Sequence, residues 1–273
     1  MSMIRPTPTT TLALRSLSFA PPAMRWRTEA MRSHDTGRLI HVTKGQGRIT
    51  VAGLTGGYGP NNLIYIPPHT MYGMEVGPTV FAQIMTLPAD TENWPATSFH
   101  LRLLDVAIQK ELQGLVEAIE RELQPTGNVR AALCHLGLLN VFVERQLAKA
   151  GMSSSDARRQ TAAARLVARY TEMIARGFRT DTSVADYAAA LNVTPTHLTR
   201  CCKHTCDRSA LGLLNDRIYY EACTLLRETD TAVQDIAKSL CFQSAAYFTR
   251  SFQSRAGLTP SEFRKKLAHV TLS

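Results

Sequence analysis

Two stretches near the carboxyl end of the chain repeat one pattern of apolar and polar positions. In residues 184–203 and 233–253, apolar side chains recur three and four positions apart, which is the spacing of one buried helix face. Each copy predicts two short helices joined by a tight turn, and Gln243 is one extra residue in the second turn. The matched pairs are Val184 with Val233, Tyr187 with Ile236, Ala188 with Ala237, Leu191 with Leu240, Val193 with Phe242, Leu198 with Phe248, Arg200 with Arg250 and Cys202 with Phe252.

Residues that favour helix starts precede these segments. Ser183 and Thr231 each stand three positions before an Asp or a Gln, which is the spacing of a capping box. Thr194 followed by Pro195 is typical of a cap and a first helical residue, and Ser244 is expected to cap the equivalent helix. Two short helices with the second presented outward have the geometry that fits a DNA major groove, although a plain helical hairpin has the same pattern.

The amino-terminal half has a different pattern, of short β-branched runs separated by Gly, Pro or Asn. Such runs, separated at regular intervals by turn residues, predict a small antiparallel barrel. The expected strands are residues 39–42, 48–51, 63–66 and 80–85.

Three further segments complete the expected organisation. Residues 1–22 are rich in Thr and Pro and are interpreted as a partly flexible arm. Residues 99–150 return to helical spacing and predict two antiparallel amphipathic helices, with a break at residues 125–128. The polar run that begins at Gly151 predicts a linker over residues 151–160 and a domain boundary there.

Charge is concentrated in the segment with the helical repeat. Residues 157–273 hold 17 Lys and Arg against 10 Asp and Glu, whereas residues 1–156 hold 14 against 12. Neutralised phosphates supply much of nonspecific DNA affinity, so this excess favours a nucleic-acid partner over a plain solvated surface. No apolar run approaches 18 residues, so no membrane partner is expected.

The six cysteines show no secreted-type framework, and reduced thiols in a bacterial cytoplasm fit best. Five of them lie in the helical segment. Cys201, Cys202 and Cys206, with His197 and His204, form a local group that raises a zinc or redox-sensor hypothesis, because nearby Arg200 and Lys203 would lower a thiol pKa.

Taken together, these residues resemble the AraC/XylS family of transcription regulators, most strongly over residues 181–265. The resemblance also rests on Leu225 and Leu226 between the two copies and on the closing run Gly257-Leu258-Thr259-Pro260-Ser261-Glu262-Phe263-Arg264. The family implies an α+β protein with an amino-terminal cupin-like β-barrel, two packing helices and a carboxyl-terminal all-α double helix-turn-helix domain. Cys206 and Cys241 depart from the family, because they stand where a turn glycine is usual.

The resemblance implies these boundaries. An arm covers residues 1–22, a cupin-like effector-binding and dimerisation domain residues 23–150, and a linker residues 151–160. The DNA-binding domain covers residues 161–273, with helix-turn-helix units at about 183–204 and 231–254 and a linker helix at about 209–228.

The resemblance also assigns groove-facing residues in the second helix of each unit. Arg200 and Arg250 are the best candidates for reading a base edge, because a guanidinium donates two hydrogen bonds to guanine; a structural salt bridge is the alternative for each. The expected base contacts are Thr196, Thr199, Arg200, Ala245, Ala246, Thr249 and Arg250. The expected phosphate contacts are Lys203, His204, Ser244 and Gln253.

A barrel of this kind implies a small-molecule effector at its mouth. The candidate lining residues are Arg38, Tyr58, Tyr65, His69 and Tyr72, each of which is also a plausible core or surface residue. His34, His41 and His69 are scattered and no His-x-His pair exists, so neither a metal nor another cofactor is expected.

The sequence thus predicts a ligand-responsive regulator that binds double-stranded promoter DNA in the bacterial cytoplasm, at the nucleoid. Its expected partners are an unknown effector, a second copy of the chain and, by resemblance, RNA polymerase. No catalytic constellation is present, so no enzyme is predicted. Two alternatives remain open: a cupin-type metal enzyme with an accessory helical domain, and a regulator that needs no ligand.

Overall fold

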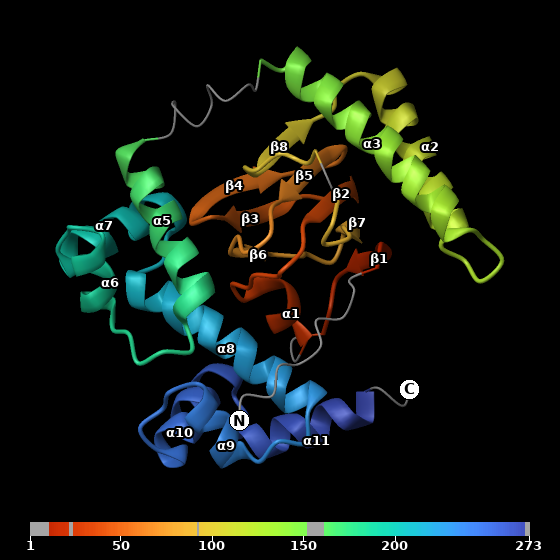
Figure 1. Cartoon of the computed structure of the whole chain (residues 1–273). Coiled ribbons are helices and arrows are strands. Elements are labelled where there is room, and N and C mark those ends of the chain that lie inside the picture. Colours follow the sequence, from red (N-terminus) through yellow and green to blue (C-terminus); the bar gives the residue numbers. More distant parts are fainter. Residues whose placement is uncertain (1–10, 22–23, 92, 152–160, 271–273) are drawn as a thin grey trace.

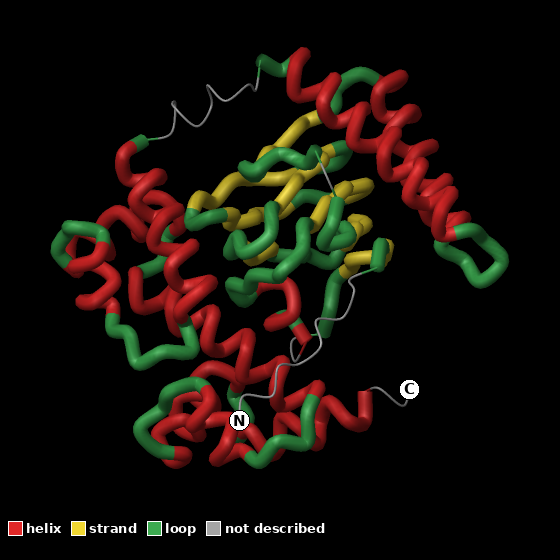
Figure 2. Tube along the Cα trace, in the orientation of Figure 1, coloured by secondary structure: helices red, strands yellow, loops and turns green. Residues whose placement is uncertain are grey.

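The structure is a computed structural model, and it describes residues 11–21, 24–91, 93–151 and 161–270. Antiparallel strands lie at the centre of the molecule, with a helical hairpin against one side (Figure 1). The carboxyl-terminal helices run along the opposite side and underneath, as the tube in Figure 2 also shows. The helical domain is therefore in contact with the strand domain and not separate from it.

The strands form two antiparallel sheets that face each other. The larger has the order β1-β7-β2-β5-β8 and the smaller β4-β3-β6. Side chains from both sheets, including Ile40, Ile49, Ile64 and Met74, fill one common core. The strands are β1 (Ala13–Ser18), β2 (Arg38–Lys44), β3 (Gly47–Val51), β4 (Leu54–Tyr58), β5 (Asn62–Ile66), β6 (Tyr72–Met74), β7 (Phe81–Thr86) and β8 (Phe99–Arg102).

Two of these strands correct the sequence-based expectations. β1 lies inside the segment that was expected to be an arm, and it pairs antiparallel with β7 from Ala13 to Ser18. Its leucines bury apolar surface on an edge strand, which the Thr- and Pro-rich composition around them concealed. β8 lies inside the expected helical segment and pairs with β5, so the helix begins only after Asp105. The expected arm residues 1–10 and linker residues 152–160 lie outside the described residues.

The helical hairpin consists of α2 (Val106–Glu122) and α3 (Val129–Lys149). Asp105 and Asn128 cap the two helices by accepting hydrogen bonds from backbone N–H groups of the first turn. Their inner faces pack on the larger sheet through residues such as Leu112, Leu136 and Phe142. Leu133 has the three- and four-residue spacing of the buried residues Leu136 and Leu139, but it is 44% exposed.

Seven helices follow in the described residues 161–270. The repeat predicted from sequence is present as α6-α7 and α9-α10, with α8 between the copies. Their bounds are α5 (Ala162–Gly177), α6 (Val184–Ala190), α7 (Pro195–Cys206), α8 (Ala210–Glu228), α9 (Val233–Ser239), α10 (Ala245–Ala256) and α11 (Pro260–Val270).

Two of the contacts between the strand domain and the helical domain, within the described part of the chain, are made by buried residues. At the first, the short helix α1 (Trp26–Glu29) places the Trp26 ring 5.5 Å from Tyr220 of α8 and 6.2 Å from Phe263 of α11. At the second, the turn between β3 and β4 brings Gly53 against Val167 of α5. The described helices include none with the length and apolar character to span a bilayer.

Candidate nucleic-acid interface

Helix α7 begins as the sequence predicts. The Thr194 hydroxyl accepts a hydrogen bond from His197 N at 3.2 Å, and Pro195 occupies the first turn, where no backbone donor is needed. The buried face carries Leu198, Cys202 and other residues of the core. The opposite face presents the expected DNA contacts: Thr196, Arg200, Lys203 and His204 are exposed and Thr199 is half-buried.

Helix α10 has the same arrangement. The Ser244 hydroxyl accepts a hydrogen bond from Tyr247 N at 3.1 Å, and Phe248 and Phe252 anchor the helix in the core. The expected DNA contacts again lie on the outer face: Ser244, Ala245, Ala246, Arg250 and Gln253 are exposed and Thr249 is half-buried.

The two arginines at matched positions are free to act on a ligand. Arg200 and Arg250 are both exposed, and within the described part of the chain neither is ion-paired to a carboxylate. The alternative of a structural salt bridge therefore has no support at either position. Arg200 does contact its own helix, because its Nη2 atom lies 3.0 Å from His197 Nδ1.

Side-chain caps fix the starts of helices α6 and α11. Ser183 and Asp186 form the complete capping box, and hydrogen bonds from Ser183 lower the pKa of Asp186. Thr259 and Glu262 form the same contact before α11, and hydrogen bonds from Thr259 likewise lower the pKa of the Glu262 carboxyl. The capping box predicted for Thr231 is wrong, because α9 has Ala232 at its N-cap without a side-chain cap.

One of the two turn cysteines was placed correctly. Cys241 has a φ of 59°, in the left-handed region where a glycine is unstrained. Cys206 is the last residue of α7, and the left-handed residue after that helix is Asp207, with a φ of 56°. The expectation for Cys206 is therefore wrong by one position. The matched residue after α10 is Gly257, also left-handed.

The cysteines of α7 point inward. Cys201, Cys202 and Cys206 are buried, and burial raises the pKa of Cys202 to about 12 and raises that of Cys206. The hypothesis that Arg200 and Lys203 lower a thiol pKa is wrong for these two residues, because desolvation of the thiolate dominates. Among the described residues, no three His, Cys, Asp or Glu side chains are placed to share a metal ion.

The structure does not gather the five candidate effector residues into one pocket. Tyr58 and Tyr72 are buried in the core between the sheets, whereas Tyr65 is buried on the other side of the larger sheet. His69 is exposed, with Nδ1 3.6 Å from Asp35. Of the five, Arg38 and Tyr72 lie together: burial lowers the pKa of Arg38, and the Tyr72 side chain opposes that shift.

Space for a small molecule exists at the contact between the two domains. A cleft of about 590 Å³ lies between α1 and α8. Two N–H donors beside it, Trp26 Nε1 and Arg25 Nε, are buried without a hydrogen-bond partner among the described residues. The lining residues that carry charge are Arg25, Glu29, Arg208, Asp216 and Arg255.

Two family models match the chain over separate stretches. One describes an AraC-like ligand binding domain and matches residues 17–140, and the other describes a helix-turn-helix domain and matches residues 187–266. The chain belongs to the AraC family. Both halves of the AraC organisation are therefore present, a strand-rich ligand-binding domain followed by a helix-turn-helix domain.

Relatives of this AraC-family chain include the HTH-type transcriptional regulator YtdP of Bacillus subtilis strain 168, which is 29% identical over 89 residues. That match covers 33% of this chain and only 12% of YtdP. Among solved structures, apo ToxT from Vibrio cholerae strain SCE256 aligns over 94% of this chain and 98% of its own length, at 12% identity and a TM-score of 0.45. The carboxyl-terminal domain of AraT, a response regulator from Geobacillus stearothermophilus, aligns over 39% of this chain and 88% of its own, at 26% identity and a TM-score of 0.37.

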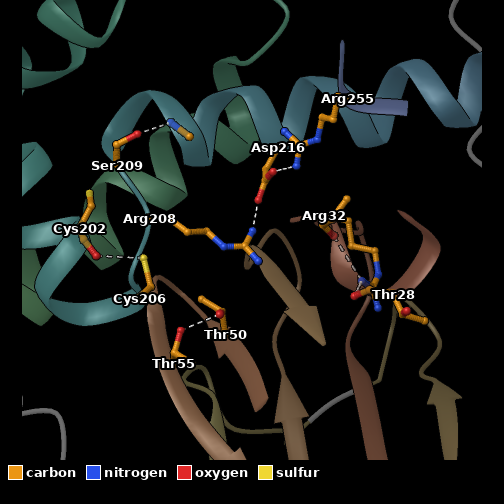
Figure 3. Close-up of polar contacts among 12 residues, drawn as sticks. Thr28, Arg32, Thr50, Thr55, Cys202, Cys206, Arg208, Ser209, Asp216 and Arg255 are labelled. Carbon is orange, nitrogen blue, oxygen red and sulfur yellow. Dashed lines mark hydrogen bonds and ion pairs between the residues drawn. The ribbon is translucent and has the colours of Figure 1, made fainter. Parts of the chain in front are cut away.

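Sequence reasoning missed two residues of the exposed surface. His197 contacts Arg200, and Tyr247 at the matched position of α10 is 54% exposed. The offset of fifty that relates Arg200 to Arg250 also relates these two residues, so the repeat contained the signal. The charged residues Arg208, Asp216 and Arg255 were missed as well. Nothing in the helical spacing marks them, because they meet only in the folded domain (Figure 3).

Proposed function

We propose that this AraC-family protein is a sequence-specific DNA-binding transcription regulator that responds to a small-molecule effector. The observation that supports this proposal most strongly is the pair of matched outer faces on α7 and α10, each with an exposed arginine. In the proposal, residues 161–273 bind promoter DNA, residues 23–150 dimerise and bind the effector together with α8, and residues 151–160 join the two domains. The protein works in the bacterial cytoplasm, at the nucleoid, where contact with RNA polymerase becomes available.

The roles within the interface follow from side-chain chemistry. Arg200 and Arg250 read guanine edges, while Thr196, Thr199 and Thr249 bond or touch neighbouring bases. Ala245 and Ala246 offer only apolar contact, which suits a thymine methyl. Lys203, His204, Ser244 and Gln253 contact phosphates and position the helices without reading sequence.

The DNA-binding part of the proposal is tested with sites selected from a pool of random duplexes. Arg200→Ala and Arg250→Ala are each expected to weaken binding to the selected site by about 1–3 kcal/mol, measured by fluorescence anisotropy at fixed salt. Arg121→Ala, at the exposed end of α2, is the control and should bind as the wild type does. Unchanged affinity in both recognition-helix variants would overturn the assignment.

We place the effector in the cleft between α1 and α8. The space between the two sheets is filled by buried side chains, whereas the cleft has room and is lined by Trp26 and Arg25, whose Nε1 and Nε atoms make no hydrogen bond within the described residues. An effector there contacts both domains, so it shifts their arrangement if it binds one arrangement more tightly than another. Asn215→Trp narrows the cleft and should abolish the thermal shift caused by any hit from a screen of aromatic acids, sugars and amines.

The control for that screen is Lys110→Trp on the exposed side of α2, which should leave the shift intact. A shift that persists in Asn215→Trp places the effector elsewhere. A screen without hits favours the alternative of a regulator that needs no ligand. The other alternative, a cupin-type metal enzyme, lacks a described group of donor residues that would hold the metal.

The dimer contact is proposed on the outer face of α3. Leu133, Leu138 and Val141 are 44%, 55% and 48% exposed, which is unusual for large apolar side chains spaced along one helix face. A second copy that packs its own α3 on this face would bury them. Leu138→Lys is expected to give a monomer in sedimentation at concentrations where the wild type is a dimer, and a wild-type monomer would overturn this part.

A further inference from the structure

Asp216 of α8 is a buried carboxylate held between two parts of the helical domain. Its side chain is 6% exposed. Arg208, which follows the last turn of α7, donates to Oδ2, and Arg255, in the last turn of α10, pairs with Oδ1 (Figure 3). Each oxygen therefore serves a different helix-turn-helix unit, and Asp216 connects both units to the spacer helix.

The arginine from α10 makes further contacts with side chains around Asp216. Arg255 also lies over the Tyr219 ring, at 4.6 Å from its centroid, and Tyr219 is 5.5 Å from Phe252. These contacts are at one edge of the α8–α10 contact. Beside them, a groove of about 240 Å³ opens between Ile218 of α8 and Phe248 of α10. Phe248 and Phe252 hold α10 in the core, and the Arg255–Asp216 contact adds a direct polar link between α10 and α8 beside this groove.

The first unit does not depend on Asp216 in this way. Helix α7 adjoins α8 through buried residues on both sides of the connecting turn, among them Cys202, Cys206, Ala210 and Leu213. The Ser209 hydroxyl caps α8 by accepting a hydrogen bond from Gly212 N at 3.0 Å. The position of α7 on α8 is thus set by short connection and packing, with Arg208 as an addition.

A carboxylate is suited to hold both arginines. A buried charge without partners is strongly unfavourable, so Asp216 favours the arrangement in which both guanidinium groups reach it. Displacing α10 along α8 would leave one oxygen of Asp216 without its partner. This penalty acts on the position of α10 along α8, and therefore on the distance between α10 and α7, because packing already fixes α7 on α8.

We propose that Asp216 sets the separation of the two recognition helices, and thereby the spacing of the two DNA half-sites that the protein accepts. The inference rests on the proposed function, because it assumes that α7 and α10 both read DNA. Asp216 is a positioning residue here: it touches no base and acts through Arg255 and the placement of α10.

The test compares the full-length wild type with single variants in selection from a pool of random duplexes, followed by sequencing. Wild-type protein is expected to select two short motifs with one fixed separation, about 10–10.5 base pairs between centres. Asp216→Asn and Arg255→Gln should select the same two motifs with a spread of separations. Arg208→Gln is the matched control: it removes the other guanidinium from Asp216 but should keep the single separation.

The affinity for duplexes of defined motif separation measures the same spacing preference quantitatively. Changing the wild-type separation by one base pair should weaken wild-type binding roughly tenfold, as a lost base contact does. The same change should weaken Asp216→Asn and Arg255→Gln roughly threefold or less. A merely structural role for Asp216 would lower affinity for every probe equally and leave the spacing preference intact.

Three outcomes decide the matter. One separation retained by both Asp216→Asn and Arg255→Gln overturns the inference while the proposed function stands. Wild-type selection without a paired motif overturns the proposed function itself. If circular dichroism shows that Asp216→Asn is unfolded, Arg255→Gln decides alone, because that variant keeps the Asp216 carboxylate paired with Arg208.

Discussion

Arg48 Nη2 of strand β3 lies 2.6 Å from Oδ2 of Asp207, the residue that follows helix α7. This ion pair joins the ligand-binding domain directly to the first DNA-binding unit. Both side chains are exposed, 53% and 73%, so solvent and salt screen the pair and it contributes little to stability. Docking of the two domains must depend mainly on buried contacts, those of Trp26 and Gly53.

Gly53→Ala is expected to weaken this docking. Gly53 has a φ of +73°, and a Cβ there would overlap Cγ1 of Val167 and lie 3.3 Å from Cγ2 of Thr171. Strain and overpacking together should lower the free energy of unfolding by roughly 1–3 kcal/mol, measured by urea denaturation.

The control for that change is Gly56→Ala, in the neighbouring strand. A Cβ at Gly56 meets nothing within 4 Å, so the free energy of unfolding should change by no more than about 0.5 kcal/mol. Equal effects at the two glycines would contradict the docking described for the β3–β4 turn.

Cys241→Gly is expected to stabilise the protein. Cys241 is exposed and held at a φ of 59°, where a side chain costs free energy and glycine has no such cost. The gain should be about 0.5–1 kcal/mol in the free energy of unfolding, after the larger entropy of glycine in the unfolded chain is included.

Cys206→Gly tests the same reasoning, because it is expected to lower the free energy of unfolding where Cys241→Gly raises it. Cys206 is buried and helical, so glycine there loses packing and helix propensity and should destabilise by about 1–3 kcal/mol. If both substitutions shift the melting temperature the same way, the conformational assignment of the two turns is mistaken.

Acid should destabilise the domain contact through His34. Its ring lies 6.4 Å from Tyr220 of α8, and burial, with Arg38, Arg32 and Arg217 nearby, lowers its pKa to about 2. The unfolded chain binds a proton at this residue near pH 6.5 and the folded chain does not, so stability falls as pH drops below about 6.5. The melting temperature of His34→Gln should therefore fall less between pH 7 and pH 5 than that of the wild type.

Part of the pH dependence of the melting temperature will remain in His34→Gln, because burial also lowers the pKa of His41 and His100. His135→Gln on α3, away from the domain contact, is the control and should keep the wild-type profile. An unchanged slope in His34→Gln would show that the histidine is protonated, or equally solvated, in the folded protein.

The thiols should divide into two reactivity classes. Cys134 and Cys241 are exposed, whereas burial raises the pKa of Cys202 to about 12 and raises that of Cys206 and Cys223. Iodoacetamide at pH 8, with peptide mass spectrometry, should label the first two within minutes and the other three only on unfolding, because the thiolate is the reactive form. Rapid labelling of Cys202 in folded protein would revive the redox-sensor hypothesis.

Local signals predicted the helical domain well. The spacing of apolar residues, the caps at Ser183, Thr194 and Ser244, and the Thr259–Glu262 contact all depend on residues within a few positions of each other, and all are present. Local signals were weaker for the strands. β1 and β8 acquire their identity from pairing with β7 and β5, which lie far away in sequence.

The candidate DNA-facing surface could be predicted from the sequence for the same reason that the helices could. On a helix, three- and four-residue spacing determines which side chains share a face, so burying Leu198 and Phe248 turns Arg200 and Arg250 outward. The five candidate effector residues could not be placed in this way. Alternation along a strand gives two faces, but only the packing of the second sheet and of α3 decides which core each face joins.

The amino-acid sequence by itself determined two repeated helix-turn-helix units and an exposed arginine in each, because helix periodicity and capping act over a single turn. Only the tertiary structure decided that Asp216 meets Arg208 and Arg255, that Gly53 lies against Val167, and that an open cleft separates α1 from α8. Asp216 and Arg255 are tens of positions apart, and Gly53 and Val167 are more than a hundred positions apart. No local sequence pattern records such contacts, because they exist only once distant segments have packed together.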